Sequence, residues 1–340
     1  MQEPIVISGT EVKAGTRQTI DIPIARLYTH TDMTMPVHVI HGKKPGPKLF
    51  ISAAIHGDEI NGVEIIRRLL KLRLIDKLRG TLIAIPVVNA YGFINHSRYL
   101  PDGRDLNRFF PGNMKGSLTS QLAYLFMEEI VSKCTHGIDL HTGSRHRNNL
   151  PQIRADLSSK ETENLANVFG APVVIDARLR DGSLREAAAG MGIPLLLYEG
   201  GEALRFNDVV IKTGMRGIIS VMRSIGNLPK TESKKKPFLP LPARSTKWTR
   251  APKSGIVQWA VPLGSTVNEG EAIAIIGDPF GEREEKVLAA SGGVVIGRLN
   301  LPLVHRGDAL FNIASVDAPE DIEHALEVID FSTESGTTTI

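Results

Sequence analysis

Cysteine, excess charge and long apolar runs are all scarce in this sequence. A single cysteine, Cys134, occurs among 340 residues, so no disulfide can form within the chain and a closed, cysteine-rich zinc site is not expected. Cys134 stands at the end of a helical pattern and is interpreted as a buried apolar residue. No apolar run approaches the roughly 20 residues that a membrane helix needs, and the N-terminus does not look like a signal peptide. We therefore expect a cytoplasmic protein without membrane contact.

Positive and negative charges are also nearly balanced in this chain. The formal net charge is +3, with 42% hydrophobic and 23% charged residues, an ordinary composition for a chain that can form one large domain and a small one. A nucleic-acid-binding protein usually shows a basic stripe. The densest basic run, residues 234–236, is better explained as a solvated linker. Nucleic acid is therefore not an expected partner.

Alternating and continuous apolar stretches predict an α/β fold. Residues 1–47 alternate short apolar and polar stretches, as antiparallel strands do. The apolar runs 48–56 and 80–88 are typical of buried strands, and the segment between them has helical periodicity. This strand–helix–strand unit indicates an α/β sheet with helices on both sides. The inward face of that helix is predicted to carry Ile60, Val63, Ile66 and Leu70.

The same alternation continues to residue 225. Further helices are predicted at 117–133 and 207–225, and further strands at 137–143, 171–176 and 192–201. Ser183 and Glu186 form an S-x-x-E capping box, which predicts the start of a short helix.

A change of composition divides the chain. Residues 1–230 form the predicted catalytic domain, and residues 231–245, rich in Pro and Lys, form a predicted linker or extended strap. Short strands separated by glycines predict a small all-β module at 246–317. Residues 318–340 are a predicted C-terminal tail, whose last residues resemble disordered sequence.

His56 and Glu59 lie where a predicted buried strand ends and a helix begins. Ligands bind at this edge of open α/β sheets, and the spacing of three lets both side chains face one point. The pair therefore has two readings. It is either part of a metal site, or a histidine bonded to backbone beside an acid that favours the helix start.

His141 favours the metal site, because it ends another predicted strand. Two histidines and one carboxylate, with an open fourth position, are the ligand set of a catalytic zinc ion. Asp139 shares a strand face with His141 and is a candidate partner for that imidazole; its other reading is a strand-edge acid. Glu199 ends the apolar strand at 192–201 and precedes two glycines. Partly removed from water there, it is a candidate general base; its other reading is a loop acid.

The loop at 95–112 concentrates arginines. Arg98, Arg104 and Arg108 occur in it with Asn107. Arginine can hold a carboxylate with two hydrogen bonds or stabilise an oxyanion. The alternative is a salt-bridged loop in which Asp102 and Asp105 neutralise the arginines, an alternative that applies most strongly to Arg104.

Four motifs together resemble one family. H-G-D-E, R-D-L-N-R-F-F-P-G, D-L-H-T-G and Y-E-G-G occur in this order, and in this the chain resembles the succinylglutamate desuccinylase/aspartoacylase family of the zinc-carboxypeptidase-like group. The resemblance covers roughly residues 45–225 and also the C-terminal β module. It implies a zinc-carboxypeptidase-like fold, which is a mixed, mainly parallel sheet flanked by helices, and one zinc ion per subunit.

The resemblance also implies a role for each motif residue. His56, Glu59 and His141 would hold the zinc, and Glu199 would act as general base and acid. Asn107 and Arg108 match the pair that holds the substrate carboxylate. Arg98 best matches the arginine that polarises the scissile carbonyl, but its distance from Asn107 in the sequence leaves Arg104 as a rival. The implied activity is removal of an acyl group from a small N-acyl amino acid or related amide, giving a carboxylate and a free amine.

The C-terminal module resembles a biotinyl/lipoyl-like barrel sandwich. A carrier domain needs a lysine at a hairpin tip, usually between methionines, and no methionine flanks Lys286. We therefore expect no attached prosthetic group. The module is instead expected to cover the mouth of the active site or a subunit interface, and a homo-oligomer is left open.

Three functions are compared. The first is a zinc-dependent amidohydrolase acting on a small-molecule N-acyl substrate. The second is a metallocarboxypeptidase acting on the C-terminus of short peptides, which a small covering domain disfavours. The third is a metal-free binding or scaffold protein, which would be expected to lack one of the four residues His56, Glu59, His141 and Glu199.

Overall fold

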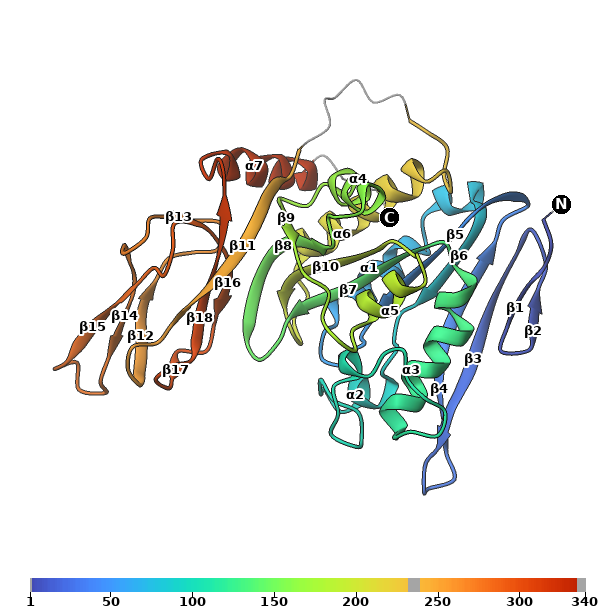
Figure 1. Ribbon diagram of the computed structural model, residues 1–340, viewed down its shortest axis with the longest axis horizontal. Helices are drawn as coiled ribbons and strands as arrows, with labels where there is room; N and C mark the ends of the chain where they lie inside the picture. The colour runs from blue at the N-terminus through green and yellow to red at the C-terminus, as the bar shows by residue number, and fades with distance from the viewer. Residues whose placement is uncertain (1, 232–238, 335–340) are drawn as a thin grey trace.

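The computed structural model describes residues 2–231 and 239–334, and a 12-stranded sheet runs through it (Figure 1). In spatial order its strands are β13 (Thr266–Val267), β16 (Gly293–Leu299), β18 (Ala309–Val316), β11 (Leu241–Arg250), β9 (Val173–Asp176), β8 (Arg147–Ala155), β10 (Leu195–Glu202), β7 (His136–Gly143), β5 (Lys44–Ala53), β6 (Arg79–Ile85), β4 (Asp32–His41) and β3 (Thr16–Arg26). A separate hairpin joins β1 (Ile5–Ile7) to β2 (Thr10–Val12).

The centre of the sheet is parallel. Strands β10, β7, β5 and β6 all run in the same direction, as their near-continuous apolar sequences predict. Most other pairings are antiparallel, including β3 with β4 and β10 with β8. Parallel pairs also join β8 to β9 and β9 to β11. The predicted mixed α/β sheet is confirmed, and its parallel pairs lie in the centre and at β8, β9 and β11, whereas the strands towards both edges are antiparallel.

Helices cover both faces of the centre. One face carries α1 (Asn61–Leu69), α4 (Lys160–Phe169) and α6 (Asp208–Ser224), whose apolar side chains share a core with Leu49 and Ile51 of β5. The opposite face carries α3 (Leu118–Glu129) and α5 (Leu184–Gly190), which pack with Phe50. Successive residues of β5 thus point to opposite cores, as strand geometry requires.

The remaining helical segments are short or peripheral. They are α2 (Ala90–Ile94), the 3-10 helices Arg73–Lys77, Leu106–Arg108 and Val131–Lys133, and the C-terminal helix α7 (Asp321–Glu334). Within the described residues, no helix combines the length and the apolar character needed to span a membrane.

Some local predictions are confirmed and others are wrong. Cys134 is buried, and Ser183 caps α5 by accepting a hydrogen bond from the Glu186 amide. On α1 the predicted Ile66 is buried, and the predicted Val63 and Leu70 are partly buried against the same core. The buried face also includes Ile65 and Leu69, which were not predicted, whereas Ile60 precedes the helix and is only partly buried. Helix α1 contacts the adjacent strands β5 and β7 of the large sheet.

Strand β8 and helix α4 were not expected. The sequence of β8, RNNLPQIRA, lacks both a continuous apolar run and strict alternation, so periodicity does not identify it. Helix α4 does carry terminal signals, because Ser159 caps its start and Gly170 ends it in the left-handed conformation.

The boundary between the expected domains is bridged by a strand. Strand β11 begins at Leu241, inside the segment expected to be a linker, and pairs with β9 on one side and β18 on the other. Residues 232–238 of that segment lie outside the described residues. The predicted tail at 318–340 is helical from Asp321 to Glu334, where Ile322 and Ala325 are buried. Residues 335–340, which are most of the stretch 330–340 that was expected to be disordered, also lie outside the described residues.

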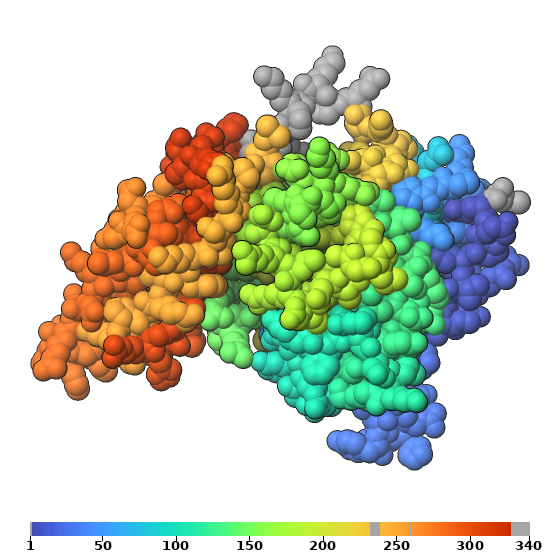
Figure 2. Space-filling view, viewed as in Figure 1, coloured from blue at the N-terminus to red at the C-terminus, as the bar shows by residue number. Residues whose placement is uncertain are grey.

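The C-terminal strands form a second apolar core. A four-stranded sheet contains β15 (Glu284–Leu288), β14 (Ala272–Gly277), β12 (Gly255–Ala260) and β17 (Leu303–Val304). Its apolar residues share a core with β16 and β18 of the large sheet, and together they make the lobe at the left of Figure 2. Lys286 lies within β15, opposite Ile275 of β14, and not at the hairpin tip.

Candidate active site

The loop that carries His56 and Glu59 connects β5 to α1. It packs against α2 so closely that a Cβ atom on Gly57 would lie 2.0 Å from the Gly92 carbonyl carbon. Gly57 is therefore needed for a close backbone approach, and its φ is not in the left-handed region that would make a turn the reason. This contact fixes the loop across the end of β5.

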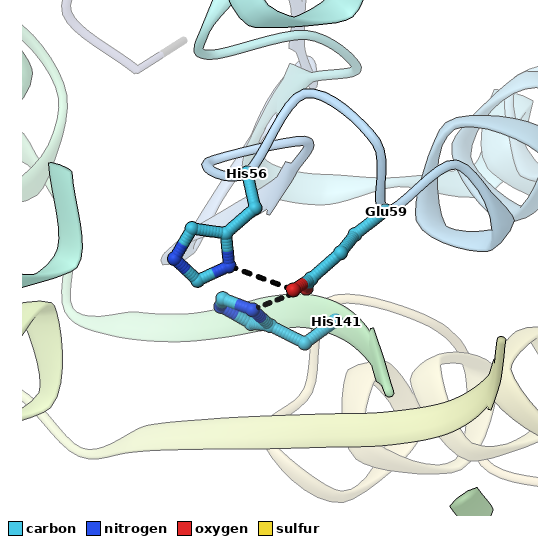
Figure 3. A group of neighbouring side chains, drawn as sticks. All are labelled: His56, Glu59 and His141. Atoms are coloured by element: carbon cyan, nitrogen blue, oxygen red, sulfur yellow. Dashed lines mark hydrogen bonds and ion pairs between the residues drawn. The ribbon is translucent and has the colours of Figure 1, made fainter. Parts of the chain in front are cut away.

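His56, Glu59 and His141 converge at the carboxyl ends of β5 and β7, and all three are at most 5% exposed. His56 Nδ1 lies 2.9 Å from Glu59 Oε1, and His141 Nδ1 lies 2.7 Å from Glu59 Oε2. One potential ligand atom from each residue falls within 4.8 Å of the others. Figure 3 shows both imidazole rings turned towards the carboxylate. The three predicted metal ligands are thus brought together.

Two aspartates hold the outer edges of the imidazoles. Asp139 Oδ2 lies 2.7 Å from His141 Nε2, and its other oxygen accepts a 2.8 Å hydrogen bond from Ser52. Asp105 Oδ1 lies 2.9 Å from His56 Nε2. Asp139 was a candidate for this contact, whereas Asp105 was predicted only to neutralise arginines. Such outer carboxylates fix the tautomer and orientation of metal-binding histidines.

The donor set fits a divalent cation. An ionised carboxylate only accepts hydrogen bonds, so Asp105 requires the proton of His56 on Nε2. His56 Nδ1 is then a buried nitrogen that has no hydrogen-bond partner among the described residues, although Glu59 Oε1 lies 2.9 Å from it. A lone pair facing a carboxylate at this distance is repulsive unless a cation lies between them. Imidazole and carboxylate together suit zinc, although other divalent metals accept them too.

The pKa shifts of Glu59 and His141 are also consistent with a cation site. Burial alone would raise the pKa of Glu59, but His56 and His141 hold that pKa well below its usual range. Burial would lower the pKa of His141, but the carboxylates of Asp139 and Glu59 raise it well above the usual value. The surrounding carboxylates therefore stabilise positive charge within the cluster, as a bound cation would require.

Glu199 lies beside His141. The two residues are paired in register on the parallel strands β10 and β7, so their side chains leave the same face of the sheet. Glu199 lines the same cavity as the three converging residues, and its side chain is 20% exposed. Asn149 donates a 2.8 Å hydrogen bond to it. The predicted partial removal of Glu199 from water is confirmed.

The two rival arginines lie in different places. Arg98 lines the cavity, and its guanidinium lies 2.9 Å from both Glu59 Oε1 and Asp105 Oδ2. Arg104 pairs with Asp102 and stacks over the Phe109 ring, and it is not among the residues that line the cavity. Asp102 and Asp105 therefore both pair with an arginine, as the alternative of a salt-bridged loop predicted, and Asp105 also contacts His56.

Asn107 and Arg108 both line the cavity. The Asn107 side-chain oxygen accepts a 2.9 Å hydrogen bond from the Leu184 amide at the start of α5, which leaves its amide nitrogen as a donor. Arg108 donates a 2.5 Å hydrogen bond to the Asn107 carbonyl and is otherwise exposed. Arg108 forms no ion pair within the described part of the chain.

A cavity of about 430 Å³ extends from His56 and His141 towards the C-terminal module. Its far wall contains Thr246 and Trp248 of β11 and Asn312 of β18. Its acidic lining residues are Glu59, Asp139, Asp176 and Glu199, whereas its arginines are Arg98, Arg108, Arg147, Arg154, Arg178, Arg180 and Arg185. The cavity away from the histidines is therefore basic.

Arg185 is the most buried of these cations and was missed by the sequence analysis. It is 9% exposed, and it donates hydrogen bonds of 2.9 and 3.1 Å to the carbonyls of Ala177 and Arg178. It makes no ion pair within the described residues. Burial and then the nearby Arg154 lower the pKa of the Arg185 guanidinium. A buried cation without an acid is costly, so this end of the cavity is suited to an anionic group of a ligand.

Comparisons with known proteins match both the fold and the motifs. A sequence model of the succinylglutamate desuccinylase/aspartoacylase catalytic domain matches residues 45–225, which is more than half of the chain. N-alpha-acetyl-L-2,4-diaminobutyric acid deacetylase of Halomonas elongata is 25% identical over 332 residues, covering 93% of this chain and 96% of that protein.

Solved structures share the fold over nearly the whole chain. The succinylglutamate desuccinylase/aspartoacylase of Rhodobacter sphaeroides has a TM-score of 0.78 at 24% identity, covering 88% of this chain and 96% of that one. The product-bound ectoine utilization protein EutE (DoeB) of Ruegeria pomeroyi has a TM-score of 0.80 at 22% identity, covering 92% and 98%. The similarity therefore includes strands of the C-terminal module as well as the central sheet.

Proposed function

We propose that this chain, which belongs to the succinylglutamate desuccinylase/aspartoacylase family, is a zinc-dependent amidohydrolase. It removes the acyl group from a small, anionic N-acyl amino acid and releases a carboxylate and a free amine. The observation that carries the proposal is the convergence of His56, Glu59 and His141 with Glu199 in register beside His141. A related protein named as a deacetylase of an N-acetylated amino acid supports the reaction type.

His56, Glu59 and His141 would hold the zinc ion, with Asp105 and Asp139 orienting the two imidazoles. When bound, zinc supplies Lewis acidity that polarises a carbonyl oxygen and lowers the pKa of water.

Glu199 moves the proton in this mechanism. Its carboxylate takes a proton from the attacking water and later delivers it to the nitrogen of the leaving amine. The Asn149 hydrogen bond leaves one carboxylate oxygen free for this exchange. A single group can serve as base and then as acid, because the proton that it takes in the first step is the one needed in the second.

The arginines orient and stabilise the substrate. Arg98 faces Glu59 within the cavity and is placed to donate hydrogen bonds to the carbonyl oxygen as negative charge develops on it. Arg108 and the amide nitrogen of Asn107 would hold the α-carboxylate, since a guanidinium matches a carboxylate in geometry. The position of Arg104 outside the cavity lining disfavours it for the role of Arg98.

The basic cavity argues for an anionic substrate. Arg185 lacks an acid partner in the described part of the protein, and Arg154 lies 3.8 Å from Glu199. An anionic substrate group would compensate the charge of Arg185, which, unlike Arg154, has no carboxylate beside it among the described residues. The C-terminal strands that form the far wall would limit the length of the substrate, which favours small amides over the peptide substrates of a carboxypeptidase.

The proposal is tested with a panel of acetyl- and succinyl-amino acids and with di- and tripeptides of the same C-terminal residues. We expect kcat/KM for the best N-acyl amino acid to exceed that for every peptide by about 10-fold or more, roughly 1.4 kcal/mol in transition-state binding. Faster release of C-terminal residues from the peptides would support the carboxypeptidase instead. No turnover of either class by the zinc-loaded protein would reject both enzymes.

A further inference from the structure

Strand β8 changes its neighbour next to the active site. Its first residues, Arg147 to Asn149, pair with β16 of the C-terminal module, whereas its later residues, from Gln152, pair with β9. On its other edge, β8 pairs with β10, which carries Glu199. Asn149 therefore stands between the C-terminal module on one side and the proposed general base on the other.

The contacts of Glu199 are uneven. Asn149 Nδ2 donates a 2.8 Å hydrogen bond to Oε2, Gln152 Nε2 lies 3.4 Å from the same oxygen, and Arg154 lies 3.8 Å from it. Within residues 2–231 and 239–334, none of the hydrogen bonds or ion pairs of this carboxylate involves Oε1. The shortest of the three contacts, that of Asn149, thus fixes one oxygen and leaves the other to exchange a proton.

Asn149 is itself held by the C-terminal module. Gly297 of β16 is its partner in register, and a Cβ atom at Gly297 would lie 2.9 Å from Asn149 Oδ1. That distance is shorter than a carbon and an oxygen tolerate, and the carboxamide would have to move. The absence of a side chain at position 297 therefore keeps the carboxamide in the orientation that reaches Glu199.

From this geometry we infer that Asn149 is a positioning residue through which the C-terminal module holds the general base. The inference rests on the proposed function, because it assigns Asn149 a role only through Glu199. Without the hydrogen bond, the flexible Glu199 side chain would occupy several rotamers, and fewer of them would face the substrate. The module thereby contributes to the rate as well as to the cavity wall.

The first test compares Asn149→Ala and Asn149→Asp with the wild-type enzyme. Both remove the donor to Oε2, and a hydrogen bond to a charged group corresponds to a fall in kcat of about 10- to 100-fold. KM should change by less than about 3-fold, because Asn149 is not proposed to bind substrate. Asn149→Asp keeps the shape of the side chain but places a second carboxyl group beside Glu199. An unchanged kcat for Asn149→Ala would mean that the donor is not needed and would overturn the inference.

A double mutant separates an action through Glu199 from a general structural effect. In a Glu199→Gln background, Asn149→Ala should lower the residual rate by less than about 2-fold, since residues that act as a unit are not additive. A full additional loss in that background would overturn the inference. Thermal unfolding of each variant checks that the fold is kept.

The second test starts from the C-terminal module. Gly297→Ala should lower kcat by about 3- to 30-fold, as displacement of Asn149 weakens part of the same hydrogen bond. Gly292→Ala is the matched control, because the closest atom to its new Cβ would be 3.6 Å away, an ordinary contact. With Asn149→Ala present, Gly297→Ala should have no further effect on kcat. An additive loss, or equal rates for Gly297→Ala and Gly292→Ala, would contradict the coupling.

These outcomes are distinct from a failure of the proposed function. A wild-type enzyme that hydrolyses none of the N-acyl amino acids overturns both proposals. An active wild-type enzyme whose kcat is unchanged by Asn149→Ala overturns the coupling alone.

Discussion

At one end of the cavity, each imidazole lies between two carboxylates, and Arg98 completes the network. At the other end, Arg185 is buried against backbone carbonyls and has no acid partner among the described residues. The two ends lie in one cavity of about 430 Å³, yet carboxylates predominate at the first end and arginines at the second.

The difference indicates what each end binds. An excess of carboxylates around two imidazoles attracts a divalent cation, and a buried arginine without an acid partner attracts an anion. A substrate whose amide lies at the cation and whose charged groups lie among the arginines would satisfy both ends. The predictions below test the two ends separately.

The largest effect is expected for Glu199, which lies beside His141 on one side and 3.8 Å from Arg154 on the other. Glu199→Gln should lower kcat by about 10²- to 10⁴-fold, because the amide cannot exchange the proton, while the metal content should stay at the wild-type level. Steady-state kinetics and metal analysis of the same sample measure both. A rate close to wild type would show that another group acts as the base.

The paired variants Arg98→Ala and Arg104→Ala test the acidic end. Arg98→Ala should lower kcat by about 10²- to 10³-fold if the guanidinium stabilises the oxyanion. Arg104→Ala should change kcat by less than about 3-fold, because an exposed ion pair contributes little. If the two effects were reversed, Arg104 would be the oxyanion-stabilising residue.

Asp105→Asn tests whether the carboxylate beside His56 serves the metal. Loss of its charge should weaken zinc binding by about 10- to 100-fold, as measured by competition with a chelator. Asp102→Asn is the matched control in the same loop, since Asp102 contacts Thr119 and Arg104. An equal loss of zinc affinity in both variants would point to a general change in the loop.

Arg185→Gln tests the basic end. For the preferred anionic substrate, kcat/KM should fall by roughly 10-fold or more, the amount expected for one hydrogen bond to a charged group. For N-acyl amino acids with an uncharged side chain, the fall should be smaller, and zinc affinity should not change. A uniform decrease across all substrates would remove Arg185 from the recognition of an anion.

The smallest effect concerns Glu64, an acid that pairs with Arg67 and Arg68 and does not line the cavity. Arg67 and then Arg68 lower the pKa of Glu64 to about 2 despite burial, which opposes the shift. A depressed pKa contributes stability above the ordinary value and loses it as the pH falls from about 5 towards 2. Glu64→Gln should therefore lower the free energy of unfolding by about 1 kcal/mol at pH 7, and the difference should shrink in acid. An equal difference at pH 7 and pH 3 would show that the ion pairs contribute nothing.

The sequence predicts the acidic end better than the basic end. His141 and Glu199 each stand at the end of an apolar strand, so strand position and residue type together identify them. Asp105 lies among loop arginines, and its contact with His56 depends on how two distant loops pack.

The basic end depends on contacts that have no local pattern. Arg185 follows a capping serine on a short helix, where an arginine is normally exposed to solvent. Strand β8, which brings Asn149 and Arg154 to Glu199, has mixed polar and apolar residues and was not predicted at all. Its role becomes visible only when β10 and β16 are placed on its two edges.

The most direct test of the account is a calorimetric titration of zinc into the metal-free protein, made with the wild type and with His141→Ala. We predict that the wild type binds one zinc ion per chain tightly, and that His141→Ala loses most of this affinity because one of its ligands is gone. Equal zinc binding by the two proteins, or no saturable binding by the wild type, would contradict the claim that His56, Glu59 and His141 form the metal site.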